Sequence, residues 1–200
     1  MNTKIQNFYI LLMCVVGLNA SRDIVATLRV GNGQTWGDWN NPEFCPESQF
    51  AYAYRMKIER MQDSGDDTSL NGIQLYCGKP FETSAFPEII SGEGPWGEWQ
   101  VPTKCRQGDY LTAFSLQVES YQGAGDDSAA NFVKFLCRGV SGEYEISQSP
   151  GHGFWGNFGP WSFSCPKGSA ICGLSTKIEK PQGQGDDTAL NDVFFFCCKF

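Results

Sequence analysis

One set of residues recurs three times along the chain at a spacing of 60 positions, and this repetition limits the folds that the chain can form. Each copy contains a cysteine, a Gly-Asp-Asp-Thr/Ser sequence, an asparagine and a second cysteine. A Trp-Gly-x-Trp/Phe segment precedes each set, beginning at Trp36, Trp96 and Trp155. Such self-similarity indicates one supersecondary unit built three times, whose copies bury their apolar faces against each other. The repeated positions are Cys45, Asn71 and Cys77, then Cys105, Asn131 and Cys137, then Cys165, Asn191 and Cys197.

Each copy predicts two β-strands joined by the acidic sequence. Large side chains alternate with small or charged ones in residues 50–58, 110–118 and 170–178, and a period of two is typical of strands. A second strand follows each Gly-Asp-Asp, because Gly, Asp and Ser/Thr favour a turn between strands. We expect the first strands to face the core with Phe50, Tyr52, Tyr54, Met56 and Ile58, then Tyr110, Thr112, Phe114, Leu116 and Val118, then Ala170, Cys172, Leu174, Thr176 and Ile178. We expect the second strands to do so with Ile73, Leu75 and Cys77, then Val133, Phe135 and Cys137, then Val193, Phe195 and Cys197.

Three such strand pairs predict an all-β domain whose sheets surround a common axis. One small sheet cannot bury an apolar face alone, whereas three sheets arranged as a prism share one core and leave few free edges. The aromatic content of 14% supplies bulky side chains for that core. No segment shows sustained helical periodicity.

The first 20 residues are predicted to be a secretory signal peptide. Residues 8–18 are almost wholly apolar, small residues follow at Ala20 and Ser21, and Lys4 is the only charged side chain of the segment. The apolar run is about half as long as a membrane-spanning helix requires. We therefore expect a secreted, extracellular protein without membrane insertion, in which residues 21–200 form one domain with repeats at about 24–80, 81–140 and 141–200.

The cysteines predict a disulfide framework. Cys14 lies in the signal peptide, and the remaining cysteines are even in number, which in an exported chain favours disulfides over metal ligands or nucleophiles. The repeated spacing predicts one bridge within each copy, and the third copy carries an extra pair. The expected bridges are Cys45–Cys77 and Cys105–Cys137, with Cys165 and Cys172 joined to Cys197 and Cys198, where analogy favours Cys165–Cys197.

The charge of the chain argues against nucleic acid and anionic lipid as partners. The formal net charge is −7, and it becomes −8 when Lys4 leaves with the signal peptide. Polyanions are repelled by such a protein, whereas neutral sugars and basic proteins suit it better. We expect extracellular coat proteins or glycans as partners, no nucleic acid, no cofactor and a monomeric protein.

Acidic side chains at equivalent positions are the candidate ligand-binding residues. Equivalent loops of a prism gather at one end of its axis, so these carboxylates could bind sugar hydroxyls, hold a cation or act as acid and base on a glycosidic bond. If the strands bulge at the loop end, the three glutamates would share one pocket near the axis. The candidates are Glu59, Glu119, Glu179, Asp66, Asp67, Asp126, Asp127, Asp186 and Asp187.

A structural role competes with ligand binding at these positions. Asp in a tight loop accepts hydrogen bonds from nearby backbone N–H groups, and an exposed strand face accepts Glu at little cost. The loop also lacks the spacing of known calcium loops, so we expect no metal site. We expect no catalytic residue to be identifiable from the sequence.

The first tryptophan of each Trp-Gly-x-Trp/Phe segment is predicted to lie in the core. Trp36, Trp96 and Trp155 hold the same position in all three copies, as core residues do. Residues three apart in a strand point to opposite faces, so Trp39 and Trp99 would be the exposed partners and could stack on sugar rings.

Taken together, the Trp-Gly-x-Trp/Phe segments, the Gly-Asp-Asp-Thr/Ser-x-x-Asn sequences and the spaced cysteines resemble the vitelline membrane outer layer protein family. The resemblance spans roughly residues 24–200. It implies a β-prism of three antiparallel Greek-key sheets with pseudo-threefold symmetry, and a place in extracellular coats such as the outer layer of egg envelopes. Members of the family have been linked to making or handling N-acetylchito-oligosaccharides, and the family supplies no agreed catalytic residues.

Two main functions follow from these features. The first is a secreted, non-catalytic structural or binding protein of an extracellular coat that associates with glycans. The alternative is a carbohydrate-active enzyme, a transferase or hydrolase acting on N-acetylchito-oligosaccharides through paired carboxylates. A calcium-dependent lectin is a third possibility.

Overall fold

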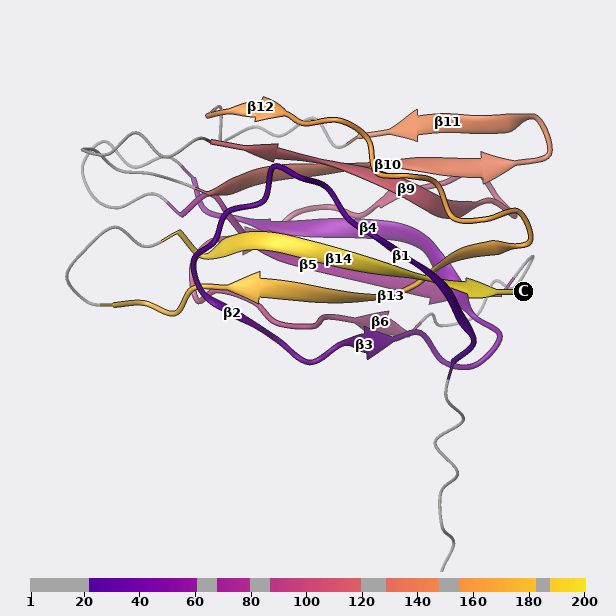
Figure 1. The fold of residues 1–200 in the computed structure, drawn as a ribbon, viewed down its shortest axis with the longest axis horizontal. Helices are drawn as coiled ribbons and strands as arrows, with labels where there is room; N and C mark the ends of the chain where they lie inside the picture. Colours follow the sequence, from indigo (N-terminus) through magenta and orange to yellow (C-terminus); the bar gives the residue numbers. More distant parts are fainter. Residues whose placement is uncertain (1–21, 61–67, 80–86, 120–128, 148–154, 183–187) are drawn as a thin grey trace, which may run out of the picture.

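The computed structural model describes residues 22–60, 68–79, 87–119, 129–147, 155–182 and 188–200. These residues form three antiparallel β-sheets around one core, and no helix occurs among them (Figure 1). The predicted all-β prism is therefore confirmed. Each sheet is built on one long strand pair: β4 (Phe50–Ile58) with β5 (Leu70–Gly78), β9 (Tyr110–Val118) with β10 (Ala130–Gly139), and β13 (Ser169–Ile178) with β14 (Leu190–Lys199). We call these the first, second and third sheets.

Short strands complete each sheet in a Greek-key order. They are β1 (Ile24–Leu28), β2 (Asp38–Trp39), β3 (Glu43–Phe44), β6 (Glu88–Ile89), β7 (Glu98–Trp99), β8 (Thr103–Lys104), β11 (Gly142–Ile146) and β12 (Asn157–Phe158). The first sheet has the order β6-β5-β4-β7 and the second has β11-β10-β9-β12, so the fourth strand returns beside the first. The third sheet, β1-β14-β13-β2, has the same spatial order. Its strands come from both ends of the chain, because β13 and β14 are the last strands and β1 and β2 are the first. Pairing of β1 with β14 therefore joins the first and last strands of the chain within the third sheet.

A β-bulge in the first strand of each pair changes which residues face the core. The pairing of β4 with β5 shifts between Ala51 and Ala53, so Tyr52 is the extra residue. The predicted alternation is correct from Tyr54 to Ile58, but it is wrong before Tyr54, because Ala51 takes the core position and Tyr52 does not. Equivalent bulges place Thr112 and Cys172 outside the central core. Phe50, Tyr110 and Ala170 were also predicted for the central core and instead form a separate small cluster.

The second strands face the core as predicted. All of their expected apolar residues are buried, and aromatic rings from the three sheets meet between them. Phe135 lies 4.6 Å from Tyr54 and 5.1 Å from Phe195, and Phe195 lies 4.8 Å from Phe114, measured between ring centroids. Edge-to-face and tilted arrangements of this kind add to the stabilisation that burial provides.

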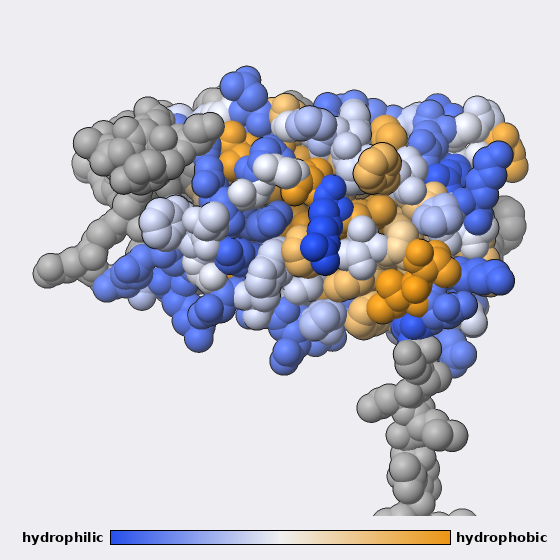
Figure 2. Space-filling model, in the orientation of Figure 1, coloured by the Kyte–Doolittle hydropathy of each residue, from blue (hydrophilic) through white to orange (hydrophobic). Residues whose placement is uncertain are grey.

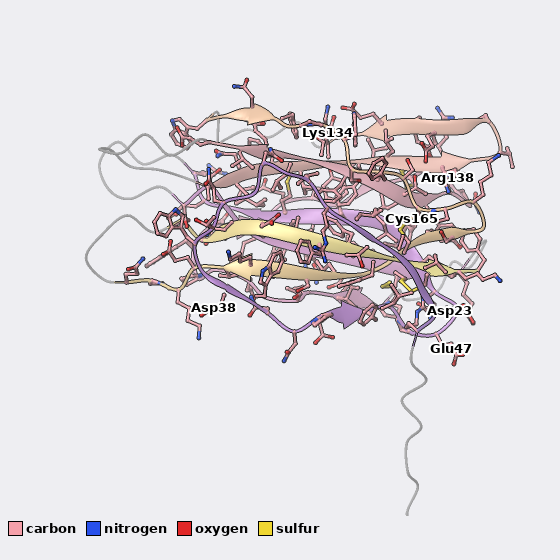
Figure 3. The ribbon with its side chains drawn as sticks, in the orientation of Figure 1. Asp23, Asp38, Glu47, Lys134, Arg138 and Cys165 are labelled. Atoms are coloured by element: carbon pink, nitrogen blue, oxygen red, sulfur yellow. A yellow bond between two sulfur atoms is a disulfide. The ribbon has the colours of Figure 1, made fainter. Side chains whose placement is uncertain are left out.

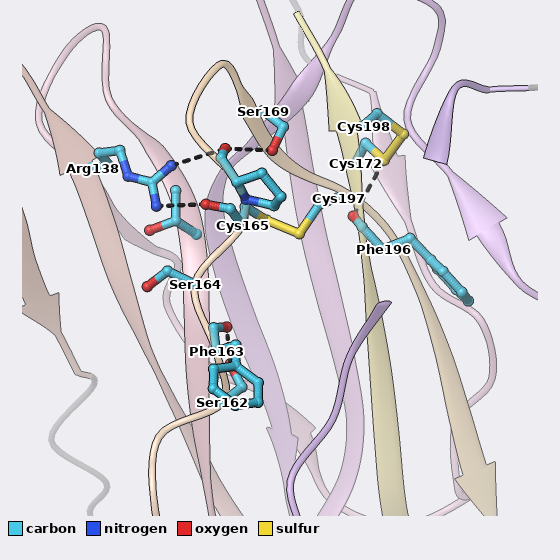
Figure 4. Close-up of a disulfide and its surroundings, with 12 residues drawn as sticks. Arg138, Ser162, Phe163, Ser164, Cys165, Ser169, Cys172, Phe196, Cys197 and Cys198 are labelled. Carbon is cyan, nitrogen blue, oxygen red and sulfur yellow. Dashed lines mark hydrogen bonds between the residues drawn. A yellow bond between two sulfur atoms is a disulfide. The ribbon is translucent and has the colours of Figure 1, made fainter. Parts of the chain in front are cut away.

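The predicted disulfide framework is confirmed in full. The bridges are Cys45–Cys77, Cys105–Cys137, Cys165–Cys197 and Cys172–Cys198. The two bridges of the third sheet lie close together, since Cys197 and Cys198 are neighbours on β14 (Figure 4). Each of the three equivalent bridges ties the segment before a first strand to the end of the second strand.

The prediction that the first tryptophan of each segment lies in the core is wrong. Trp36 is 48% exposed and Trp96 is 45% exposed, while Trp155 is half-buried. The glycine that follows each of them explains this. Gly97 has a φ of +77°, and a Cβ atom there would overlap the backbone of Ile58 and Glu59 at the end of β4. Backbone rather than a ring therefore fills this space, and Gly37 and Gly156 repeat the arrangement.

The second aromatic residue of each segment covers the outer side of a neighbouring sheet. Trp39, on β2, stacks on Phe194 of β14 at 4.0 Å. The Arg55 guanidinium lies 5.0 Å from the Trp99 ring, and the Lys134 ammonium lies 4.6 Å from the Phe158 ring. Each Trp-Gly-x-Trp/Phe segment thus joins its own repeat to the sheet of the preceding one.

Candidate functional site

Two of the glutamates predicted as ligand-binding residues, Glu59 and Glu179, accept hydrogen bonds from the threonine that follows the acidic loop of their own copy. Glu59 Oε2 accepts a hydrogen bond from Thr68 Oγ1 at 2.5 Å, and Thr68 Oγ1 accepts one from the buried Asn71 Nδ2 at 2.6 Å. The third copy repeats both bonds, at 2.6 Å each, among Glu179, Thr188 and Asn191. This arrangement explains why Glu, Thr and Asn recur together. The six aspartates lie outside the described residues: Asp66, Asp67, Asp126, Asp127, Asp186 and Asp187.

Among the residues that the structure describes, Glu59 and Glu119 line two different hollows. Glu59 lines an open hollow of about 440 Å³ beside Gly97. Glu119 is buried and lines a different hollow, of about 550 Å³, beside Gly156. These hollows lie at equivalent positions, where a Trp-Gly-x-Trp/Phe segment crosses a strand end, so they follow from the repeat itself. Ligand binding by the acidic end stays a prediction.

The outer faces of the three sheets differ from one another much more than the acidic ends do. We call them the first, second and third faces, after their sheets. Three equivalent positions, each spaced by 60 residues, carry different side chains on each face. In the order first, second and third face they are Tyr52, Thr112 and Cys172 at the bulge, Tyr76, Leu136 and Phe196 on the second strand, and Lys104, Ser164 and Phe44 on the segment that crosses the sheet.

Apolar groups fill the third face at these positions. Cys172 forms its bridge with Cys198 here (Figure 4). The ring centroids of Phe44 and Phe196 lie 5.2 Å apart. Figure 2, which views the side of the molecule that bears β1 and β14, shows apolar side chains along this face. The exposed Ile24 and Val25 of β1 extend this apolar surface.

A carboxylate of the chain itself fills the second face. Glu143, on β11, accepts hydrogen bonds from Thr112 Oγ1 at 2.9 Å, from Ser164 Oγ at 3.0 Å and from Arg138 Nη2 at 2.8 Å. Arg138 also donates to the Cys165 carbonyl at 2.7 Å, so its position is fixed from two sides (Figures 3 and 4). Burial favours the protonated acid, but the three donors outweigh it and lower the pKa of Glu143. The second face therefore holds a bound carboxylate.

The described residues of the first face leave a hollow at the same place. A hollow of about 420 Å³ is lined by Tyr52, Tyr76, Lys104 and Glu88, together with Ala53 and Pro102. Burial raises the pKa values of the Tyr52 and Tyr76 phenols, with a smaller contribution from Glu88. Both phenols therefore stay protonated at neutral pH and can donate hydrogen bonds. Two aromatic rings, a cation and an acid meet in one hollow.

The polar groups at the edge of this hollow support one another. The Gln74 amide donates to Glu88 Oε2 at 2.7 Å and accepts a hydrogen bond from Arg55 Nε. Arg55 also lies 3.7 Å from Glu88 and above the rings of Tyr76 and Trp99. This network fixes the ring of Tyr76 as a wall of the hollow. Pockets that combine apolar rings with a few fixed polar groups are typical of small-ligand sites.

Sequence reasoning missed this site because it followed the residues that the three copies share. The useful indication was a difference between the copies. Tyr52, Tyr76 and Lys104 stand at equivalent positions of the repeat, but the other two copies carry other residue types there. The described residues contain no group of His, Cys, Asp and Glu side chains placed to hold a metal ion. None of the described segments forms a helix that could cross a membrane.

Asp192, on the third face, gives a prediction on pH dependence. Burial raises the pKa of Asp192, although the Val193 N–H, Lys177 and Arg29 act in the opposite direction. A raised pKa means that the folded protein disfavours the carboxylate, so this cost is present at neutral pH and disappears as pH falls below the unfolded aspartate pKa. Asp192→Asn keeps an oxygen for the Val193 N–H and removes the charge.

We therefore expect Asp192→Asn to be more stable than the wild type at about pH 7 and to lose this advantage by about pH 3. Urea unfolding of both proteins at the two pH values checks this. A variant that is less stable at neutral pH would show that the attraction of Lys177 and Arg29 outweighs the burial of Asp192.

Comparison with known proteins gives consistent matches over most of the chain. A family model described as Vitelline membrane outer layer protein I (VOMI) matches residues 26–200. The human protein "Vitelline membrane outer layer protein 1 homolog" is 49% identical over 175 residues, covering 87% of this chain and 83% of the human one. The mouse protein of the same description is 46% identical over 170 residues, covering 84% and 81%. Among solved structures, Calystegia sepium agglutinin has a TM-score of 0.49 and 14% identity, covering 90% of this chain and 99% of the agglutinin.

Proposed function

The chain belongs to the vitelline membrane outer layer protein I family, and on this premise we propose that it is a secreted, non-catalytic protein of an extracellular coat that binds glycans. The family match over residues 26–200 is the observation that carries the proposal. Four disulfides in a domain of this size support an oxidising, extracellular environment. The predicted signal peptide, residues 1–20, lies outside the described residues and supports export.

We place the glycan in the hollow of the first face. A sugar ring presents both C–H groups and hydroxyls, and this hollow presents both aromatic rings and fixed polar groups. The faces that correspond to it are filled by Glu143 on the second sheet and by Phe44 with the Cys172–Cys198 bridge on the third. One binding site per chain follows, despite the threefold repeat.

A glycan array tests this function with one variant and one control. Tyr76→Leu places in the first face the residue that already occupies the equivalent position 136, so the fold should tolerate it. We expect wild-type protein, residues 21–200, to bind a subset of the array and Tyr76→Leu to bind the same glycans about tenfold more weakly. Phe158→Leu removes a partly exposed ring from the second sheet and should leave binding unchanged.

Two other outcomes of the array would redirect the proposal. Binding that survives Tyr76→Leu would favour the acidic end of the prism, with Glu59, Glu119 and Glu179 and the six aspartates, as the glycan site. Absence of binding to any glycan by the wild type would refute the function itself and leave coat proteins as the partners to test.

A further inference from the structure

We propose that the hollow of the first face binds the anionic group, a carboxylate or a sulfate, of an acidic sugar residue, with Lys104 as its ion-pair partner. This inference rests on the proposed glycan-binding function and adds the class of glycan. Its basis is a comparison of the three faces, which descend from one repeated pattern and occupy the same place in different ways.

The second face shows what this place in the fold accommodates. There the carboxylate of Glu143 is held by Thr112, Ser164 and Arg138, with all three donors within 3.0 Å. Two of these donors stand at repeated positions, the bulge residue and the residue of the crossing segment. The outer face of this sheet thus forms a carboxylate site that the chain fills from its own β11.

The first face keeps the two positions but does not supply an equivalent acid from its described residues. Tyr52 replaces Thr112 and Lys104 replaces Ser164, so one hydroxyl is kept and a cation replaces the other. Glu88 is not the counterpart of Glu143. It pairs with Tyr76, as Glu145 pairs with the equivalent Leu136, and therefore corresponds to Glu145.

The charges of the hollow favour an anion. Glu88 forms an ion pair with Arg55 at 3.7 Å and accepts a hydrogen bond from the Gln74 amide, which leaves Lys104 as the cation of the hollow without an acidic partner among the described residues. Lys104 is exposed, lines the hollow and makes no hydrogen bond or ion pair to any residue that the structure describes. A hydrogen bond between an ammonium and a carboxylate or sulfate is among the stronger polar contacts.

The net charge of the whole chain limits how many negative charges the ligand can carry. With a net charge of −7, the protein repels polyanions, and this repulsion acts over about 8 to 10 Å at physiological salt. A single acidic residue on an otherwise neutral glycan can reach Lys104, because the rest of that glycan carries no charge for the protein to repel. The inferred ligand is therefore a neutral oligosaccharide that ends in one acidic sugar, rather than a polysulfated chain.

Titration calorimetry with three saccharides of one neutral core tests the inference. The probes are the uncharged core, the core with a terminal sialic acid and the core with a single terminal sulfate. The proteins are residues 21–200 of the wild type, Lys104→Gln, and Lys167→Gln as a control that removes the same charge from an exposed turn. We expect one site per chain, and about tenfold tighter binding of at least one charged saccharide than of the core.

The variants then separate the causes. Lys104→Gln should lose the preference for charge while it still binds the core, whereas Lys167→Gln should behave as the wild type does. Higher salt should weaken the binding of the charged saccharides only.

Preference for sialic acid alone or for sulfate alone would support the inference and identify the group. Equal affinity for core and charged saccharides, or a preference that survives Lys104→Gln, would overturn it and leave the glycan-binding function standing. Failure of the wild type to bind any of the three would overturn the inference, whereas the function itself is refuted only by absence of binding across the whole glycan array.

Discussion

The Gly97→Ala variant is expected to lose about 3 kcal/mol or more of unfolding free energy. Two costs add at this position. A residue other than glycine pays about 1–2 kcal/mol for the left-handed backbone at φ +77°. The added methyl group also overlaps the backbone of Ile58 and Glu59, and backbone in a paired strand cannot move aside as a side chain can. To relieve this overlap, β7 would have to separate from β4, although the two strands are paired at this point.

Gly168→Ala is the matched control for this prediction. Gly168 has nearly the same φ, +78°, but a Cβ atom there would have no neighbour within 4 Å. It should therefore lose only the backbone term, about 1–2 kcal/mol. Urea unfolding with the disulfides intact measures both variants. Equal losses for Gly97→Ala and Gly168→Ala would mean that close approach of the crossing segment is not the reason for the repeated glycine.

Truncation of Phe135 to alanine is expected to cost about 3–5 kcal/mol. Its ring is 0% exposed and lies between Tyr54 of the first sheet and Phe195 of the third, so removing it opens a cavity where all three sheets meet. The sheets are tied by three equivalent disulfides and have little freedom to collapse into that cavity. The same urea experiment checks this value.

Phe163→Ala provides the comparison for the core variant. Phe163 is 91% exposed, and its removal should change the unfolding free energy by no more than about 0.5 kcal/mol. A cost below about 1 kcal/mol for Phe135→Ala would contradict a single core shared by the three sheets, because a shared core cannot lose its central ring without a cavity.

The repeat allowed the fold and its disulfides to be predicted from sequence. A spacing of 60 residues between cysteines, glycines and asparagines requires three equivalent units, and alternation identified their strands. The spacing also paired Cys45 with Cys77 and Cys105 with Cys137 correctly. These predictions succeeded because each depends on residues that repeat, and repeated residues occupy equivalent positions in the fold.

Backbone irregularities could not be predicted from the repeat spacing. A bulge adds one residue to a strand without changing its composition, so the bulge at Tyr52 reversed the faces of the residues before it. Trp36 and Trp96 were placed in the core because they hold the same position in every copy, but the neighbouring glycine brings backbone there instead. Both errors concern local geometry that strand periodicity does not record.

The candidate site could not be found by following the repeat, because it lies where the repeat is broken. Position 104 carries Lys, whereas its counterparts Ser164 and Phe44 belong to filled faces. Only the packed structure shows that one face is filled by Glu143, another by aromatic rings, and that the remaining face is open. The acidic residues drew attention first because they repeat, and two of them, Glu59 and Glu179, prove to bond to the threonine that follows the acidic loop in their own units.

The location of the bound glycan tests most directly whether the first face is the binding site. Amide chemical shifts of ¹⁵N-labelled protein, residues 21–200, can be followed while the tightest-binding saccharide is added. We expect shifts around Tyr52, Tyr76, Glu88 and Lys104, with the equivalent residues of the second and third faces unchanged. Shifts confined to the acidic end, around Glu59, Glu119 and Glu179, would contradict binding at the first face.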